Sequence, residues 1–197
     1  MPKIVDHDSQ REKFVQAAMR LIARSGLEGV TMRAVATEAG LSYGSLFHYF
    51  NSKDDLLMHA VEYSTAQQTL RVNEYGNRYK GLKALEKLLC DDAILNDSSR
   101  DAWMVWMTFL YKAALQESFA AMNKELIDGW LERIAGLLLQ AQQLGEISSA
   151  LKPREEAMAV WAFSAGLGQV GLLQADALAP ALQRKLIRGY LDKLRQA

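Results

Sequence analysis

The sequence predicts an all-α protein in which a small N-terminal helix-turn-helix unit precedes a larger helical unit, with about nine helices altogether. Apolar residues recur at helical spacing along nearly the whole chain, and no segment alternates as a half-buried strand does. Glycines and capping residues separate these periodic segments. Half of the 197 residues are hydrophobic and only three are proline, so a folded chain with a substantial core is expected.

The first helix is expected to begin at a capping box made by Ser9 and Glu12 and to end at Gly26. One face of this segment is apolar with the period of an α-helix. The residues of that face are Phe14, Ala17, Ala18, Leu21 and Ile22.

The segment 31–50 has the pattern of two short helices joined by a tight glycine turn. Thr31 can cap the first helix, Gly40 can end it in the left-handed conformation, and Ser42 can cap the second helix. This is the pattern of a helix-turn-helix, which places its second helix in the major groove of DNA. An ordinary helical hairpin is the alternative, but the combined spacing near the N-terminus favours DNA binding. A small core is expected from Val35, Leu41, Leu46, Phe47 and Phe50.

Beyond this unit, the remaining helices are expected to form one larger bundle. Pro153 suits the first position of a helix, and Gly145 suits the end of one. The two units are assigned to residues 1–51 and 52–197, joined by a bridging helix that starts at Ser52. The expected helices cover about 52–73, 82–94, 100–116 and 119–144, with a break at 73–81. One more begins at Pro153, and a last one follows a turn at 176–180 and carries Leu182, Leu186, Tyr190 and Leu194 on one face.

The charge balance is unusual for a DNA-binding chain. Formal net charge is zero, and residues 1–60 hold seven Lys or Arg side chains against seven Asp or Glu. DNA binding must therefore depend on where the charges lie. A polar N-terminus without a signal peptide and a single Cys90 favour the cytoplasm. The apolar run 157–173 contains Gln169 and three glycines, so an interface helix is expected rather than a membrane span.

Three segments resemble the TetR family of transcriptional regulators. They are the runs from Phe14 to Gly26, from Val30 to Arg33 and from Gly44 to Leu57. A weaker similarity around 102–106 is to the choline-responsive BetI-type branch. The resemblance implies a homodimer that binds a palindromic operator on double-stranded DNA and answers to a small-molecule effector.

The resemblance also implies which residues would contact DNA. Arg33 is the best candidate for a base contact, because its guanidinium can donate two hydrogen bonds to guanine. Four residues of the second helix would face the groove: Tyr43, Gly44, Ser45 and His48. Phosphate contacts are expected from Thr31, Ser42, Tyr49 and Lys53. The alternatives are that Thr31 and Ser42 are caps only and that Arg33 is merely solvated.

The larger unit is rich in tryptophan and methionine, which line adaptable apolar pockets but also fill ordinary cores. An aromatic cage of this kind suits a quaternary ammonium group, but the sequence assigns no carboxylate to it. The residues expected at a ligand pocket are Tyr63, Trp103, Trp106, Met107, Leu110, Tyr111, Phe119, Met122, Trp130, Met158 and Trp161.

The last two helices are expected to form a dimer interface, because small residues let helices approach closely and helix-turn-helix proteins read two half-sites. The interface residues expected are Ala162, Ala165, Gly166, Leu182, Leu186 and Tyr190. No catalytic constellation, metal-ligand spacing or cofactor motif is visible, so no enzyme, metal or cofactor is expected. The sequence therefore favours a ligand-responsive DNA-binding regulator, most simply a repressor. The alternative is a helical small-molecule-binding protein without specific DNA binding.

Overall fold

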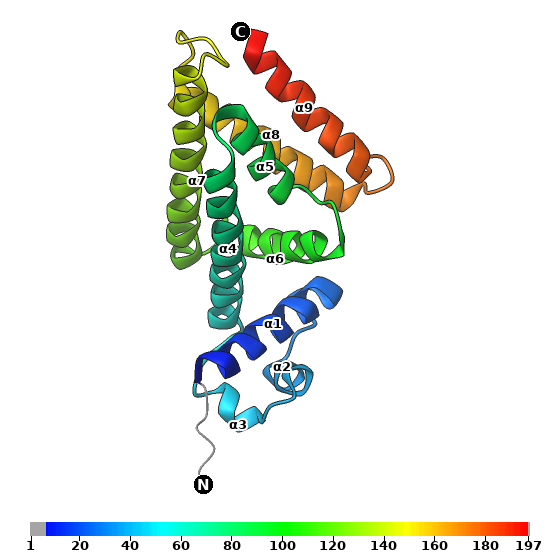
Figure 1. The fold of residues 1–197 in the computed structure, drawn as a ribbon. Coiled ribbons are helices and arrows are strands. Elements are labelled where there is room, and N and C mark those ends of the chain that lie inside the picture. Colours follow the sequence, from blue (N-terminus) through cyan, green and yellow to red (C-terminus); the bar gives the residue numbers. More distant parts are fainter. Residues whose placement is uncertain (1–6, 197) are drawn as a thin grey trace.

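The computed structural model describes residues 7–196, and within that range it is all-helical. Figure 1 shows α1, α2 and α3 gathered at one end, with the long α4 leading away from them and α8 and α9 crossing at the other end. The helices are α1 (His7–Ser25), α2 (Met32–Ala39), α3 (Tyr43–Leu46), α4 (Lys53–Arg78), α5 (Gly81–Asp92), α6 (Asp97–Ala113), α7 (Glu117–Gln143), α8 (Pro153–Leu173) and α9 (Pro180–Gln196). The predicted fold class and helix order are confirmed.

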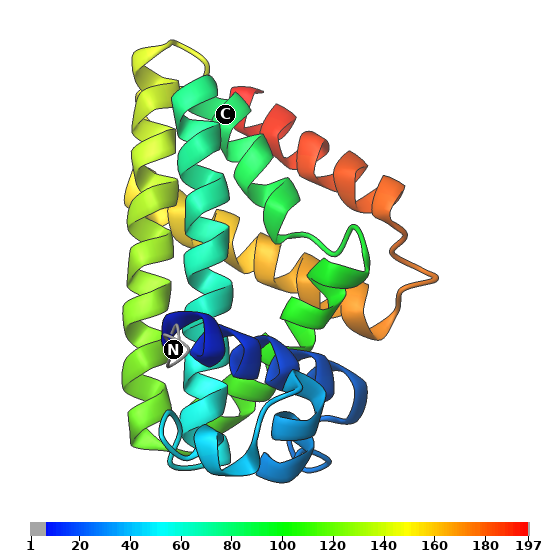
Figure 2. The same cartoon turned by 60° about the horizontal axis from the view of Figure 1, so that its bottom comes forward.

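The caps of the helix-turn-helix are those the sequence predicts. Thr31 Oγ1 accepts from the Ala34 N–H at 3.1 Å, and Ser42 Oγ accepts from the Ser45 N–H at 3.0 Å. Gly40 lies in the left-handed region with φ of 67°. These local bonds satisfy helix-terminal groups that would otherwise lack partners, so the turn is fixed by its own residues. In Figure 2 this unit comes forward, with α3 beside α2.

The predicted start of the first helix is wrong. α1 already includes His7, so Ser9 lies inside the helix rather than at its cap. The Glu12 carboxylate instead accepts hydrogen bonds from Gln16 at 2.8 Å and from Tyr63 of α4 at 2.8 Å. The Glu12 side chain, which a capping box would need at the start of the helix, is therefore engaged in a contact with another helix. The predicted end is confirmed, since Gly26 has a φ of 66°.

α4 is longer than the sequence predicts, and the expected break after residue 73 is wrong. The helix continues through Gly76 to Arg78. Tyr75, which lies in this last part, is held by α5: its ring packs on the apolar cluster that α5 shares, and its hydroxyl donates to Asp91 at 3.2 Å. Packing against a neighbouring helix thus outweighs the roughly 1 kcal/mol that a helical glycine costs.

Two apolar clusters hold the molecule together, and their limits do not follow a boundary at residue 51. The first contains α1, α2 and α3 together with Leu57 of α4, Phe109 of α6 and Phe119 of α7. The second joins the far half of α4 with α5, α7, α8 and α9. The helix-turn-helix therefore shares its core with the helices that follow it, which provides a rigid mechanical connection.

α8 is the one helix among residues 7–196 that is long and apolar enough to cross a membrane by length and composition, with a mean hydropathy of 1.2. A central helix of a bundle meets the same two criteria. Here α8 packs against α5, α6 and α7, and a Cβ placed on Gly168 would overlap the ring of Trp103. The contacts of α8 are thus those of a packed bundle helix.

Gln183 is a buried polar residue that fastens α9 to the loop after α5. Its side chain accepts from the Ile94 N–H at 3.0 Å and donates to the carbonyls of Ile94 and Leu178, both at 2.9 Å. We expect Gln183→Leu to lower the free energy of unfolding by about 2–4 kcal/mol, because it leaves those backbone groups buried without partners. Chemical denaturation at fixed protein concentration measures this. The exposed Gln143→Leu is the control, and equal losses in both variants would contradict the assignment.

Candidate DNA-binding surface and ligand cavity

The outer face of the helix-turn-helix carries a stacked cluster of one cation and two aromatic rings. The Arg33 guanidinium lies over the Tyr43 ring, 5.1 Å from its centroid. Tyr43 meets Phe47 edge-to-face, with 5.0 Å between centroids. Tyr43 is 42% exposed and Phe47 is 48% exposed. A planar guanidinium held on an aromatic ring is partly pre-oriented for bidentate hydrogen bonding.

The prediction that Phe47 belongs to the core is wrong. Leu46 and Phe50 fill the interior instead, with 0% and 1% exposure. Phe47 comes one residue after α3 and four residues after Tyr43, so it shares the outward face of Tyr43. That spacing was the available signal. We therefore add Phe47 to the candidate DNA-binding surface.

The other residues of this unit that are predicted to contact DNA differ in whether their polar groups already form hydrogen bonds within the chain. Gly44 and His48 are exposed. The Ser45 hydroxyl donates to the Ser42 carbonyl at 2.8 Å, and the Lys53 ammonium lies 3.4 Å from the Leu27 carbonyl. Thr31 and Ser42 use their hydroxyl oxygens as caps but stay at the surface. Their contacts to DNA remain predictions.

Tyr49 is placed differently from the phosphate contact that was predicted. Its hydroxyl is 2.8 Å from His7 Nδ1 and donates to Gln10 Oε1 at 3.3 Å, and its ring packs on Phe14 and Phe50. This hydroxyl is already engaged by α1. Tyr49 therefore joins α1 to the end of the recognition segment, by which we mean α3 and the residues that follow it, 43–51.

Some basic side chains of the helix-turn-helix unit are bound to a carboxylate of the same unit, whereas others remain available for DNA phosphates or bases. Arg20 and Arg24 both bind Glu38, at 2.9 and 2.7 Å, and their hydrogen bonds lower the pKa of that carboxyl. These pairs join α1 to α2. Arg33 is exposed and forms no ion pair with any carboxylate of residues 7–196. Arg33 is thus among the basic side chains of this unit that no carboxylate of the described residues binds, and it is the one that lies over the Tyr43 ring.

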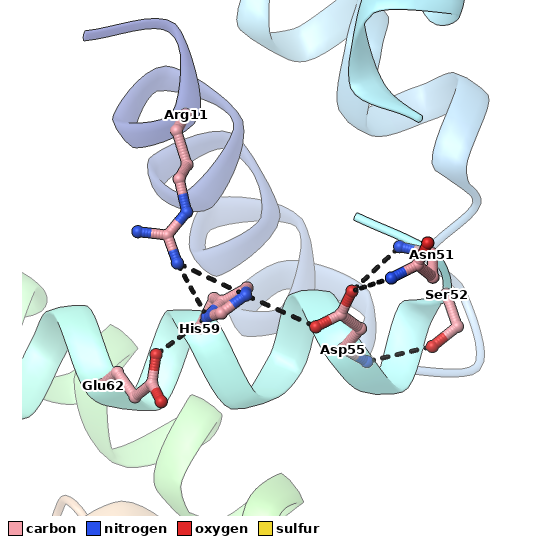
Figure 3. A network of polar contacts seen from close by, with 6 residues as sticks. All are labelled: Arg11, Asn51, Ser52, Asp55, His59 and Glu62. Atoms are coloured by element: carbon pink, nitrogen blue, oxygen red, sulfur yellow. Dashed lines mark hydrogen bonds and ion pairs between the residues drawn. The ribbon is translucent and has the colours of Figure 1, made fainter. Parts of the chain in front are cut away.

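A polar network fastens the start of α4 to α1 (Figure 3). Arg11 of α1 reaches His59 of α4 at 3.0 Å, and His59 Nδ1 is 2.7 Å from Glu62. One turn earlier, Asp55 contacts His59 at 3.4 Å and accepts from the Asn51 N–H at 2.9 Å. The network therefore connects α1, the end of the recognition segment and the first three turns of α4.

Tyr63 extends this connection toward the larger unit. Its hydroxyl donates to Glu12 at 2.8 Å and accepts from Gln16 at 2.9 Å, both on α1. Burial raises the pKa of Tyr63, and the neighbouring Glu12 adds to that rise. The same side chain lines a large cavity on its other side. A shift of the Tyr63 side chain would therefore displace or break its two hydrogen bonds to α1.

The cavity lies among α4, α5, α6, α7 and α8 and has a volume of about 840 Å³. This is large enough for a drug-sized ligand, for which pockets of roughly 300–1,000 Å³ are typical. Its wall includes Met19 of α1, so the helix-turn-helix unit contributes to it directly. Seven predicted pocket residues line it: Tyr63, Trp103, Trp106, Met107, Leu110, Trp130 and Trp161.

Four predicted pocket residues do not line the cavity, and those predictions are wrong. Tyr111 is 68% exposed, because it follows Leu110 and so points away from the cavity side of α6. Phe119 is buried against Phe109, with 5.6 Å between centroids, and Met122 packs on the same core. Met158 is exposed on α8. Helical spacing alone could not separate cavity, core and surface sides.

The cavity contains a carboxylate that the sequence did not identify. Asp92, the last residue of α5, accepts a hydrogen bond from Ser164 of α8 at 2.5 Å and a long one from Gln68 of α4 at 3.4 Å. Burial raises the pKa of Asp92, against the opposing effect of these two hydrogen bonds. The expectation that no carboxylate accompanies the tryptophans is thereby corrected.

Exposed apolar residues lie on both α8 and α9. On α8 they include Ala162 and Gly166, and Leu182 and Leu186 of α9 are 38% and 40% exposed. We call this the α8–α9 face; its other exposed apolar residues are Met158, Val170 and Leu173. The two other predicted interface residues lie elsewhere. Ala165 lines the cavity, and the Tyr190 ring stacks on Phe163 at 4.5 Å while its hydroxyl donates to Glu156.

Comparison with known proteins gives consistent matches to both parts of the chain. Residues 14–60 match the bacterial regulatory proteins of the tetR family, and residues 82–196 match the C-terminal region of BetI-type transcriptional repressors. The HTH-type transcriptional regulator PksA of Bacillus subtilis (strain 168) is 33% identical over 141 residues, which are 70% of this chain and 68% of that protein. The HTH-type transcriptional regulator BetI of Burkholderia mallei (strain NCTC 10229) is 26% identical over 203 residues, covering 98% of this chain and 97% of that protein.

Solved structures share the whole fold. A regulator from Saccharomonospora viridis in complex with choline has a TM-score of 0.85 at 24% identity and covers 94% of this chain and 96% of its own. The regulator FadR from Bacillus subtilis in complex with stearoyl-CoA has a TM-score of 0.77 at 20% identity and covers 93% and 96%. At these identities the likeness concerns the fold alone. The two sequence matches decide the family: the chain belongs to the TetR family of bacterial transcriptional regulators, and its C-terminal part is of the BetI type.

Proposed function

We propose that this regulator is a repressor that binds a palindromic operator as a homodimer and is released by a small molecule in the cavity. The observation that carries the proposal is the position of Tyr63, which lines the cavity and hydrogen-bonds to Glu12 and Gln16 of α1. An effector that displaces Tyr63 would change the position of α1 and of the recognition segment packed on it. In a bacterial cell such a protein would act in the cytoplasm, where the operator is.

The α8–α9 face supports the homodimer. Its exposed apolar side chains extend over both helices, and such a face on a single chain is typical of an interaction site. A twofold axis through it would place two recognition segments on one side of the pair, and two half-sites on DNA match that symmetry. The proposed operator is therefore an inverted repeat.

Release by an effector needs a difference in affinity between two states of the dimer. A ligand must prefer the released state by about 5.5 kcal/mol to shift an equilibrium from 1:99 to 99:1. Burial of apolar ligand surface, at roughly 25 cal/mol per Å², can supply a large part of this in a cavity of about 840 Å³. Two solved structures of the same fold, one in complex with choline and one in complex with stearoyl-CoA, support a small-molecule ligand for this chain.

Selection of bound sequences from random DNA, followed by affinity measurements at one fixed salt concentration, tests the DNA-binding part. We expect an inverted repeat, and we expect Arg33→Ala to weaken binding to it by about tenfold while relaxing the preference at one base pair of each half-site. The matched control is Arg154→Ala, which removes an exposed arginine of α8. No retention of any DNA at moderate salt by the folded wild-type protein would contradict the proposal and favour a ligand carrier.

A further inference from the structure

The polar groups of the cavity that lack full partners are hydrogen-bond acceptors. Asp92 accepts from Ser164 and Gln68, and no cationic side chain of residues 7–196 forms an ion pair with it. The neighbouring carboxylate, Asp91, is already paired with Arg71 at 2.9 Å. Asp92 therefore brings an acidic group to the cavity wall without a counter-ion.

A second acceptor points to the same conclusion. The Oδ1 atom of Asn123, on α7, is buried and has no hydrogen-bond donor, and Asn123 lines the same cavity. A buried carbonyl oxygen without a donor costs about 1–3 kcal/mol, so a group that supplies the donor is favoured here. The cavity wall thus has one acidic group without a counter-ion, at Asp92, and one hydrogen-bond acceptor without a donor, at Asn123.

Between these polar groups the wall is aromatic. Trp103 and Trp106 come from α6, Trp130 from α7 and Trp161 from α8, and all four line the cavity. The Trp103 indole N–H donates to the Asp92 backbone carbonyl at 2.6 Å, which fixes that ring next to the carboxylate residue. The faces of indole rings attract cations, most strongly where water is excluded.

We propose that the cavity binds an organic cation with an apolar body, for which Asp92 is the counter-ion and Asn123 accepts a hydrogen bond from a donor group when the ligand has one. The volume of about 840 Å³ calls for a body larger than a small headgroup such as that of choline. This inference deepens the proposed function, on which it rests for its regulatory meaning, by naming the chemical class of the effector.

Binding of such a cation is coupled to a proton. Burial raises the pKa of Asp92, and the nearby charge of Asp91 adds to the rise, so Asp92 in the empty cavity holds its proton more tightly than an exposed aspartate does. The groups that face it are Ser164 of α8, Gln68 of α4 and Asp91, whose charge Arg71 balances. A bound cation favours the carboxylate, so the proton leaves when the ligand enters. Affinity for a permanent cation therefore increases with pH until Asp92 is ionised in the empty protein.

Three probes with one chain length and different head groups test the charge preference: octyltrimethylammonium, octanol and octanoate. Calorimetry on the full-length protein without DNA measures their affinities. We expect the cation to bind at least about tenfold more tightly than octanol, and octanoate to bind most weakly. We also expect the affinity for the cation, whose own charge is fixed, to increase with pH as Asp92 ionises, at a higher pH than an exposed aspartate would. Equal or tighter binding of octanol or octanoate overturns the proposal.

Asp92→Asn assigns the preference to this residue, because it keeps the shape and one acceptor oxygen but removes the charge. We expect the variant to lose about tenfold in affinity for the cation, to lose the pH dependence, and to bind octanol as the wild type does. Asp128→Asn, on the exposed side of α7, is the matched control. An unchanged preference for the cation in a folded Asp92→Asn overturns the assignment; if the variant does not fold, the wild-type series and its pH dependence decide alone. Operator binding is measured separately, so failure here does not affect that part of the proposed function.

Discussion

Gly44→Leu is expected to reduce operator affinity by about a thousandfold, which is the approximate difference between specific and non-specific DNA binding. Gly44 lies in α3, is exposed and has a negative φ, so its backbone does not require glycine. A Cβ placed on it would meet no other atom within 4 Å. The folded chain therefore does not explain a glycine at this position, whereas a DNA surface at van der Waals distance does.

The same substitution is expected to leave the fold intact or to stabilise it. Leucine favours a helix over glycine by roughly 0.5–1 kcal/mol, so the melting temperature should stay the same or increase. Gly136→Leu is the matched control, since Gly136 is also helical, exposed and without neighbours around its missing Cβ, but lies on α7. Both variants are compared by thermal denaturation and by titration of the selected operator. Wild-type affinity in Gly44→Leu would remove α3 from the DNA interface.

The parts of the fold that were predicted correctly are those determined by neighbours in the sequence. Thr31, Gly40 and Ser42 act through bonds that span at most five residues, so their residue types predict the turn. The start of α1 and the end of α4 depend on contacts between helices instead. Glu12 bonds to Tyr63 and Tyr75 bonds to Asp91, and no local pattern contains those partners.

The residues of the cavity show more clearly that contacts between distant parts of the chain cannot be predicted from local sequence. Trp103, Trp106, Met107 and Leu110 were predicted together because they share a side of one helix. Asp92 was missed because its partner Ser164 is 72 residues away in the sequence. The end of an apolar helix such as α5 is an ordinary place for aspartate, and only the packing of α5 on α8 shows that this carboxylate lies at the cavity wall against Ser164. Asp92, the group that says most about the chemistry of the effector, can thus be identified only from the tertiary structure.

Leu186→Arg is expected to produce a monomer and to lower operator affinity by about a hundredfold. Leu186 is 40% exposed on the α8–α9 face, next to the exposed Leu182 one turn earlier. Within the chain the inner side of α9 is held by Ile187 and Leu191, which are buried, so the substitution should not disturb folding. In a dimer formed through this face the new arginine of each subunit would be desolvated without a counter-ion, and the cost of burying these charges opposes association.

The loss on DNA follows from the loss of the dimer. When two recognition segments are joined, the second binds at an effective concentration that increases affinity by about 10²–10⁴, and a monomer loses this gain. Sedimentation velocity gives the oligomeric state, and operator titration gives the affinity. Leu70→Arg is the control, because Leu70 is 58% exposed on α4 and lies outside the α8–α9 face. A Leu186→Arg protein that stays dimeric, or a Leu70→Arg protein that becomes monomeric, would show that the subunits associate through a different surface.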